Sequence, residues 1–186
     1  HDQEKWIELI NRYLKINKGM KVLDLGCGPG FFSVMLTNLG CQVIGIDYSD
    51  KMLEEARNNA RKFKANVEFQ KMDVQDLAFQ DEIFDLIITR NVTWNLEKPV
   101  QAYQEMVRVL KKQGHLLNID GNHYYYYQDQ DYNRAGHSDH QHMEGIDVSI
   151  IDNIAKELKL SYVLRPRYDI EILKEIGFQQ IGSEIL

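Results

Sequence analysis

The chain has 186 residues, of which 44% are hydrophobic and 27% charged, and its formal net charge is −6 at pH 7. These values fit a single globular domain with its own hydrophobic core. The negative charge disfavours nucleic acid as a partner, because nucleic-acid binding depends on basic surface. The chain has neither an apolar run of about 18 residues nor a signal-peptide pattern, so we expect no membrane partner and a cytoplasmic location.

Hydrophobic periodicity predicts that strands and helices alternate after a first helix over residues 6–16. The expected strands are residues 20–25, 42–46, 67–71, 84–89 and 115–120, the last one after Gly114. The expected helices between them are residues 31–39, 49–63 and 99–110, with Ser49 as an N-cap. Strands separated by helices form right-handed βαβ units. The sequence therefore predicts an α/β fold with a doubly wound, mostly parallel Rossmann-like sheet and helices on both faces.

The end of the first expected strand carries the most informative pattern. Residues 22–31 read V-L-D-L-G-C-G-P-G-F, with Asp24 ahead of three glycines spaced two apart. Glycines permit a positive φ and the close approach of a ligand to the backbone. Asp47 ends the next strand, where an acidic side chain can accept hydrogen bonds from both ribose hydroxyls. The pattern indicates a pocket for an adenosine-containing cofactor.

The same pattern favours a sulfonium cofactor over a dinucleotide. The dinucleotide fingerprint is G-x-G-x-x-G with a pyrophosphate at the helix N-terminus, and here the third glycine comes one position early. Asp24 would repel a pyrophosphate, whereas it would attract the sulfonium and ammonium of S-adenosylmethionine. An NAD-dependent oxidoreductase is the weaker alternative.

The run D-L-G-C-G-P-G followed by G-I-D-Y-S resembles motifs I and II of the class I S-adenosylmethionine-dependent methyltransferases. Residues 108–117 are similar to the type 11 methyltransferase subgroup, which includes ubiquinone and menaquinone C-methylases. The resemblance extends from Lys18 to Asp120. It implies the class I methyltransferase fold and methyl transfer from S-adenosylmethionine, with S-adenosylhomocysteine as the product.

The resemblance also implies how the cofactor is bound. The glycine loop would cradle the methionine part, with Asp24 accepting a hydrogen bond from its ammonium. Asp73 and the backbone N–H of Val74 would bind the adenine. The expected cofactor-binding residues are Asp24, Gly26, Cys27, Gly28, Gly30, Asp47, Tyr48, Met52, Asp73, Val74, Arg90 and Asn91.

Three of these residues have alternative interpretations. Asp47 could cap the helix that begins near Asp50. Asp73 could be an exposed turn residue. Arg90 could pair with an acidic acceptor, with Asp85 or with another local carboxylate.

The acceptor is expected to bind beside the residues that follow the fourth and fifth strands. Trp94 could shield the reaction from water or stack on an acceptor, and it could equally be a core residue. The expected substrate-binding residues are Trp94, His123, Tyr124 and Tyr126. No catalytic residue is assigned, but His123 and Tyr124 are candidates for a general base.

The histidines have two interpretations. The spacings of His137, His140 and His142, with His123, could converge on zinc, but we expect His137 to His142 to be surface residues of a loop and expect no metal. Cys27 and Cys41 are expected to be small buried thiols, because their number and spacing do not fit a disulfide framework.

The predicted single domain has four parts: an N-terminal helix (1–18), a cofactor-binding core (19–120), an acceptor-binding cap (121–167) and a C-terminal helix and strand (168–186). Helices are expected over residues 149–158 and 168–176, and a sixth strand over 178–185. No residues remain for the seventh strand of the family, so we expect the last strand to be missing.

The expected function is methyl transfer to a small-molecule acceptor by a monomer or homodimer. A regulatory protein that binds the cofactor without catalysis is the alternative.

Overall fold

The computed structural model describes residues 2–125, 128 and 148–184, which divide into two compact units. The first unit consists of the described residues up to Arg90 together with Gln101–Ile119, and it contains the sheet. The second unit is formed by Asn91–Val100 and the described residues from Asp120 onward. The prediction of one domain over the whole chain stays a prediction.

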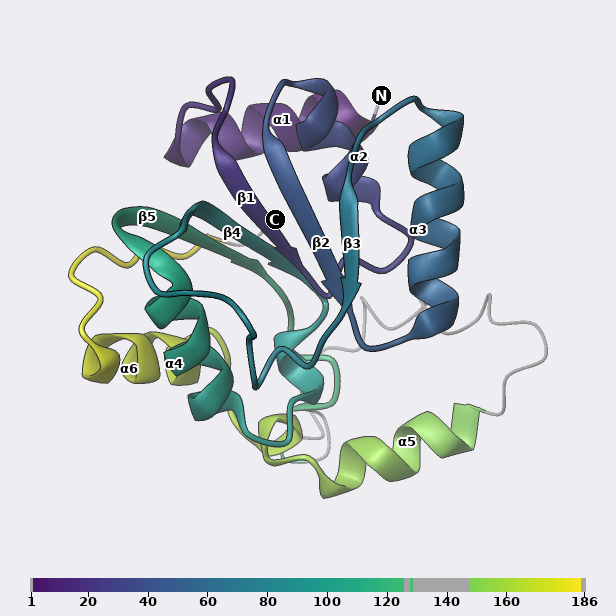
Figure 1. The fold of residues 1–186 in the computed structure, drawn as a ribbon. Coiled ribbons are helices and arrows are strands. Elements are labelled where there is room, and N and C mark those ends of the chain that lie inside the picture. Colours follow the sequence, from purple (N-terminus) through teal and green to yellow (C-terminus); the bar gives the residue numbers. More distant parts are fainter. Residues whose placement is uncertain (1, 126–127, 129–147, 185–186) are drawn as a thin grey trace. The chain divides into compact units, whose positions relative to one another are not determined.

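The sheet has five strands that are all parallel, in the order β3-β2-β1-β4-β5 (Figure 1). The strands are β1 Lys21–Leu25, β2 Gln42–Asp47, β3 Glu68–Lys71, β4 Phe84–Arg90 and β5 Leu110–Ile119. Because all of them run the same way, the segments that follow β1, β2, β3 and β4 leave the sheet at one edge. The reversal of strand order lies between β1 and β4.

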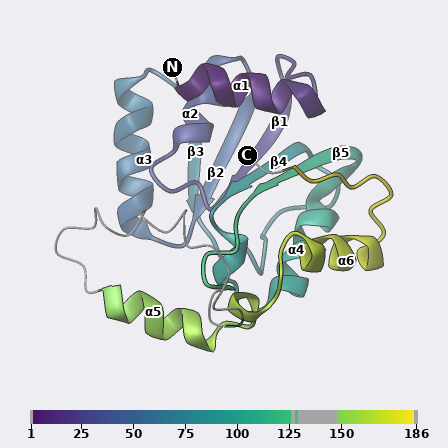
Figure 2. The ribbon, with the colours of Figure 1, turned by 180° about the vertical axis from the view of Figure 1, so that it is seen from behind.

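Helices cover both faces of the sheet, as predicted (Figures 1 and 2). On one face, Ile10 of α1 and Phe32, Met35 and Leu36 of α2 pack in one cluster with Val22 of β1. On the other face lies α4, whose Tyr103 and Met106 are fully buried. The first-unit helices are α1 Asp2–Tyr13, α2 Phe31–Asn38, α3 Asp50–Lys62 and, from Gln101 onward, α4 Pro99–Val109.

The second unit is built from short elements. It contains the 3₁₀ turns η1 Thr93–Asn95 and η4 Lys159–Tyr162 and the helices α5 Val148–Glu157 and α6 Arg167–Ile176. Gly177 ends α6 with a φ of +111°, as the sequence predicted. No described helix of the chain is long and apolar enough to cross a bilayer.

The first helix and the fifth strand differ from their predicted bounds. Helix α1 begins at Asp2 and ends at Tyr13, earlier than predicted at both ends. Strand β5 begins at Leu110, because Leu110 pairs with Phe84 and His115 with Leu86. Between these two pairs β5 advances five positions while β4 advances two, so the pairing is irregular there. Gly114 lies inside this irregularity, where an added Cβ would be 2.7 Å from the Leu110 side chain.

The predicted sixth strand is wrong for residues 178–184, which form no strand. The amide of Phe178 is still bonded to the carbonyl of Leu173 at the end of α6 (2.9 Å). Beyond it only Ile181 is half-buried, whereas the other side chains are exposed. The segment therefore lacks the apolar face that a strand would bury.

Candidate functional site

The glycine loop between β1 and α2 is an open backbone surface in the first unit. Gly26, Gly28 and Gly30 all have positive φ, as their residue type predicted. A Cβ on Gly30 would lie 3.1 Å from Cβ of Ala56, so Gly30 allows the loop to pack on α3. A Cβ on Gly28 would meet nothing within 4 Å. The space beside Gly28 is therefore available to a ligand.

Asp47 connects the end of β2 to this loop. Its Oδ2 accepts a hydrogen bond from the backbone N–H of Gly28 (2.8 Å), and its Oδ1 accepts one from the N–H of Ser49 (2.9 Å). The helix cap is Ser49, whose Oγ accepts from the N–H of Met52 (3.3 Å), so the capping alternative for Asp47 is wrong. A carboxylate has about four acceptor positions, which leaves two for the hydroxyls of a sugar.

Asp24 is a buried carboxylate in the middle of β1, with 2% of its surface exposed. Ser33 donates a hydrogen bond to its Oδ2 (2.5 Å), and the glycine opposite, Gly45, leaves room for the Ser33 hydroxyl. Burial raises the pKa of Asp24 to about 6, although the bond from Ser33 opposes the shift. At neutral pH the group is mostly ionised and poorly compensated, so it suits a cationic ligand.

Four further residues of the predicted cofactor site lie at the ends of β2 and β3. Tyr48 is 74% exposed, so its ring is available for stacking. Met52 is half-buried in the first turn of α3. Asp73 forms a turn in which its Oδ1 accepts from the backbone N–H of Gln75 (2.8 Å), and it is half-buried rather than exposed. Val74 is buried.

Arg90 ends β4 with its guanidinium 5.6–5.8 Å from the centres of three rings, those of Trp6, Phe31 and Phe32. The predicted alternative of an Arg90–Asp85 pair is wrong, because Asp85 accepts from Lys111 Nζ (2.6 Å) and the backbone N–H of Lys21. Within the described residues the Arg90 guanidinium has no hydrogen bond or ion pair. Its N–H donors are therefore held in place by the rings and available to an anion.

Cys27 contributes its backbone to the site rather than its thiol. Its N–H donates to the carbonyl of Ile46 (2.8 Å), which extends the pairing of β1 and β2 into the loop. Burial, with Asp24 and Asp47 nearby, strongly raises the pKa of the Cys27 thiol. Cys27 and Cys41 are both buried and free, as predicted.

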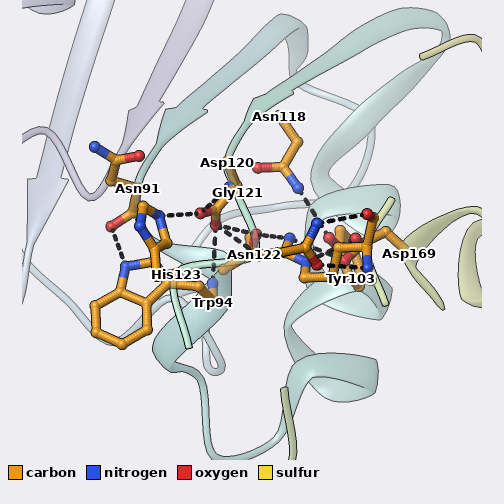
Figure 3. A network of polar contacts seen from close by, with 11 residues as sticks. Asn91, Trp94, Tyr103, Asn118, Asp120, Gly121, Asn122, His123 and Asp169 are labelled. Atoms are coloured by element: carbon orange, nitrogen blue, oxygen red, sulfur yellow. Dashed lines mark hydrogen bonds and ion pairs between the residues drawn. The ribbon is translucent and has the colours of Figure 1, made fainter. Parts of the chain in front are cut away.

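In the second unit, Asp120 is the centre of a polar network (Figure 3). Its side chain is 3% exposed, and its oxygens contact five donors. These are Thr93 Oγ1 (2.7 Å), the N–H of Trp94 (2.8 Å), the N–H of Gly121 (2.8 Å), His123 Nε2 (3.2 Å) and Arg165 Nη1 (3.0 Å). Burial would raise the pKa of Asp120, but His123, Arg165 and the other donors outweigh it and hold this pKa below its usual range.

Arg165 and Asp169 are the residues that sequence reasoning missed. Arg165 Nε donates to Asp169 Oδ2 (2.8 Å), and Arg165 Nη2 donates to Thr93 Oγ1 (2.5 Å). The backbone of Arg165 forms a reciprocal pair with the side chain of Asn122, at 2.7 and 2.8 Å. The i, i+4 spacing of Arg165 and Asp169 at the start of a helix was the available signal, but nothing in the sequence connects these two residues to Asp120.

Two of the residues predicted to bind the acceptor, His123 and Tyr124, lie beside a third, Trp94. Its ring centroid lies 5.3 Å from that of His123 and 5.3 Å from that of Tyr124, and its Nε1 donates to the carbonyl of Asn91 (3.1 Å). Trp94 is half-buried, whereas Tyr124 is 3% exposed. Tyr126, His137, His140 and His142 lie outside the described residues.

Residues 16–162 match the family model described as "Methyltransferase domain". The chain belongs to this family. The family is that of the S-adenosylmethionine-dependent methyltransferases, and the five-stranded sheet agrees with its class I fold, so the predicted family and fold class are confirmed.

Two curated relatives are methyltransferases of quinone biosynthesis. A ubiquinone biosynthesis O-methyltransferase from Coxiella burnetii is 30% identical over 54% of this chain and 43% of its own length. A demethylmenaquinone methyltransferase from Listeria welshimeri is 32% identical over 62% of this chain and 51% of its own. The chain thus spans about half the length of these relatives.

A solved structure of phosphoethanolamine N-methyltransferase 2 from Haemonchus contortus, in complex with S-adenosyl-L-methionine, has a TM-score of 0.69. The structural match covers 95% of this chain and 36% of the Haemonchus contortus chain. At 22% identity, this likeness shows the fold alone.

Replacing Gly28 with alanine is expected to weaken S-adenosylmethionine binding by about tenfold or more, because the methyl group would project into the ligand space. Gly19→Ala is the matched control, since Gly19 also has a positive φ (+82°) with nothing within 4 Å of an added Cβ. Both variants should lose about 1–2 kcal/mol of stability through backbone strain. Calorimetric titration should show an affinity loss for Gly28→Ala only, and equal losses would contradict the assignment.

Replacing Asp24 with asparagine is expected to stabilise the ligand-free protein by about 3 kcal/mol at pH 7. The pKa of Asp24 is raised from 3.8 to about 6, so the native state carries the cost of the buried charge above pH 6 and loses that cost as the pH falls towards 3.8. S-adenosylmethionine affinity of the native protein should fall by up to about tenfold per pH unit below pH 6. Urea unfolding and titrations from pH 5 to 8 test both effects, and a pH slope unchanged in Asp24→Asn would refute the role.

Proposed function

We propose that this chain transfers a methyl group from S-adenosylmethionine to a small molecule. The observation that carries the proposal is the open backbone at Gly28, with the buried carboxylate of Asp24 in the preceding strand and the loop bonded to Asp47. S-adenosylmethionine requires a carboxylate for its ammonium, a second carboxylate for its ribose hydroxyls and an accessible backbone beside them. Asp24, Asp47 and Gly28 could supply these three features. Membership of the methyltransferase family supports the same function.

Each proposed cofactor contact follows from the chemistry of one residue. Asp24 accepts from the ammonium of the methionine part, and Asp47 accepts from the ribose hydroxyls. The exposed ring of Tyr48 and the thioether of Met52 contact the adenine. The adenine amino group donates to Asp73, and the N–H of Val74 donates to the adenine ring. The loop residues Gly26, Cys27, Gly28 and Gly30 complete the proposed set, together with Asn91, which follows Arg90 in the chain.

Arg90 is proposed to bind the carboxylate of the methionine part. Two of the rings that hold its guanidinium, Phe31 and Phe32, directly follow Gly30 of the loop. Arg90 is also close enough to Asp24 to lower the pKa of that carboxyl. An α-amino acid carries one positive and one negative group, so a carboxylate and a guanidinium near the same loop complement its two charges.

The cofactor supplies a methyl group on a positively charged sulfur, which is an excellent leaving group. The protein therefore has to orient the acceptor and exclude water. Trp94, His123, Tyr124 and Tyr126 are proposed to contact the acceptor. The names of the two curated relatives make a quinone-type aromatic ring the proposed acceptor class.

Incubation with methyl-labelled S-adenosylmethionine and a panel of aromatic alcohols, amines and thiols tests the function. We expect the release of S-adenosylhomocysteine to depend on the acceptor. At limiting cofactor, Gly28→Ala should lower the rate of this release by about tenfold or more. Mass spectrometry detects both products. Binding of NAD without binding of S-adenosylmethionine would contradict the proposal.

Decarboxylated S-adenosylmethionine, which lacks only the carboxylate, tests the role of Arg90. Arg90→Met should weaken binding of the intact cofactor by about 10- to 100-fold, the usual effect of losing a charged hydrogen bond. It should leave the affinity for the decarboxylated compound unchanged. Lys62→Met is the control, because Lys62 is another exposed cation over an aromatic ring, that of Phe63. Equal losses for the two compounds would assign Arg90 a structural role.

A further inference from the structure

The contact between Asp120 and His123 determines which ring nitrogen of the histidine can act as a base (Figure 3). Asp120 Oδ1 lies 3.2 Å from His123 Nε2. An ionised carboxylate can only accept hydrogen bonds, and the donors around Asp120 hold its pKa low, so Nε2 carries the hydrogen. The lone pair of the neutral ring is then on Nδ1.

A buried ion-pair network lies behind this contact. Asp120 and Asp169 both contact the buried guanidinium of Arg165, at 3.0 and 2.8 Å. Two carboxylates around one guanidinium give these three residues a formal charge of −1. Arg165 therefore holds Asp120 in place, and Asp120 in turn orients the imidazole through its contact with Nε2.

The exposure of the neighbouring rings distinguishes His123 from Tyr124. The side chain of His123 is 28% exposed, whereas Tyr124 is 3% exposed and lies against Trp94. A tyrosine would also have to lose its own proton before it could act as a base. The half-buried indole of Trp94 next to His123 offers a flat surface to an aromatic acceptor.

We propose that His123, oriented by Asp120, is the general base that removes the proton of a hydroxyl group on an aromatic acceptor. This inference rests on the proposed methyl transfer and names its acceptor class, a phenol or hydroquinone. His123 is the catalytic residue, and Asp120 is a positioning residue that acts through it.

The proposed step is balanced in atoms and charge. The acceptor O–H bond breaks, and its proton goes to Nδ1 of His123. The oxygen keeps the electron pair and forms the new bond to the methyl carbon, while the pair of the broken carbon–sulfur bond stays on sulfur. The protonated His123 then returns its proton to water.

The tautomer of His123 gives a test that needs no substrate. Nitrogen-15 NMR of labelled protein distinguishes Nε2–H from Nδ1–H in a neutral imidazole, and His123→Ala identifies the signal. We expect the Nε2–H tautomer. A neutral ring with its hydrogen on Nδ1 would overturn the proposal, because the lone pair would then face Asp120.

A pair of acceptors that differ in one atom gives the second test. 2-Naphthol needs a base, whereas 2-naphthalenethiol ionises readily without one. With saturating S-adenosylmethionine, His123→Ala should lower kcat for the naphthol by about 10²–10⁴-fold more than kcat for the thiol, whose change reports only the lost contact with the acceptor. His115→Ala, at an exposed histidine of β5, is the matched control and should change neither.

The possible results separate the two proposals. Methylation of thiols or amines but of no phenol, or equal losses for naphthol and thiol in His123→Ala, would refute the role of His123 while leaving methyl transfer intact. No cofactor binding, or no methylation of any acceptor, would refute the proposed function itself. The tautomer of His123 would still report on its pairing with Asp120.

Discussion

The hydrogen bond from the backbone of Gly28 to Asp47 is the interaction on which the candidate cofactor site depends. It connects the loop after β1 to the end of β2, strands that are neighbours in the sheet. A parallel sheet brings successive strand ends to one edge, but it does not determine the path of the loops there. Asp47 fixes that path, and with both oxygens engaged by backbone N–H groups it still has acceptor capacity for a ligand.

Asp24 and Asp120 show how two environments give the same residue type different properties. Both are almost fully buried. Asp24 has one hydroxyl donor and its pKa is raised to about 6, whereas Asp120 is surrounded by five donors and its pKa is lowered. The poorly compensated acid suits a cationic ligand, while the well-compensated acid suits a fixed role in holding other side chains.

The two buried acids also differ in what a sequence can reveal about them. Asp24 belongs to a short contiguous motif, so its proximity to the glycine loop follows from chain connectivity. Asp120 was recognisable only as a residue after a strand, because its partners Thr93 and Arg165 are distant in the chain. Arg90 was predicted to belong to the site, but the sequence did not indicate the three rings that hold it, which come from α1 and α2.

The sequence by itself determined the alternation of strands and helices, the glycine loop, the Ser49 cap and the end of α6 at Gly177. These features depend on residues that are close in the chain, through periodicity, capping and glycine backbone freedom. Only the tertiary structure decided where β5 begins, that residues 178–184 form no strand and that Arg165 joins Asp120 to Asp169. Those outcomes depend on which distant segments share hydrogen bonds and buried surface, and no local pattern encodes that.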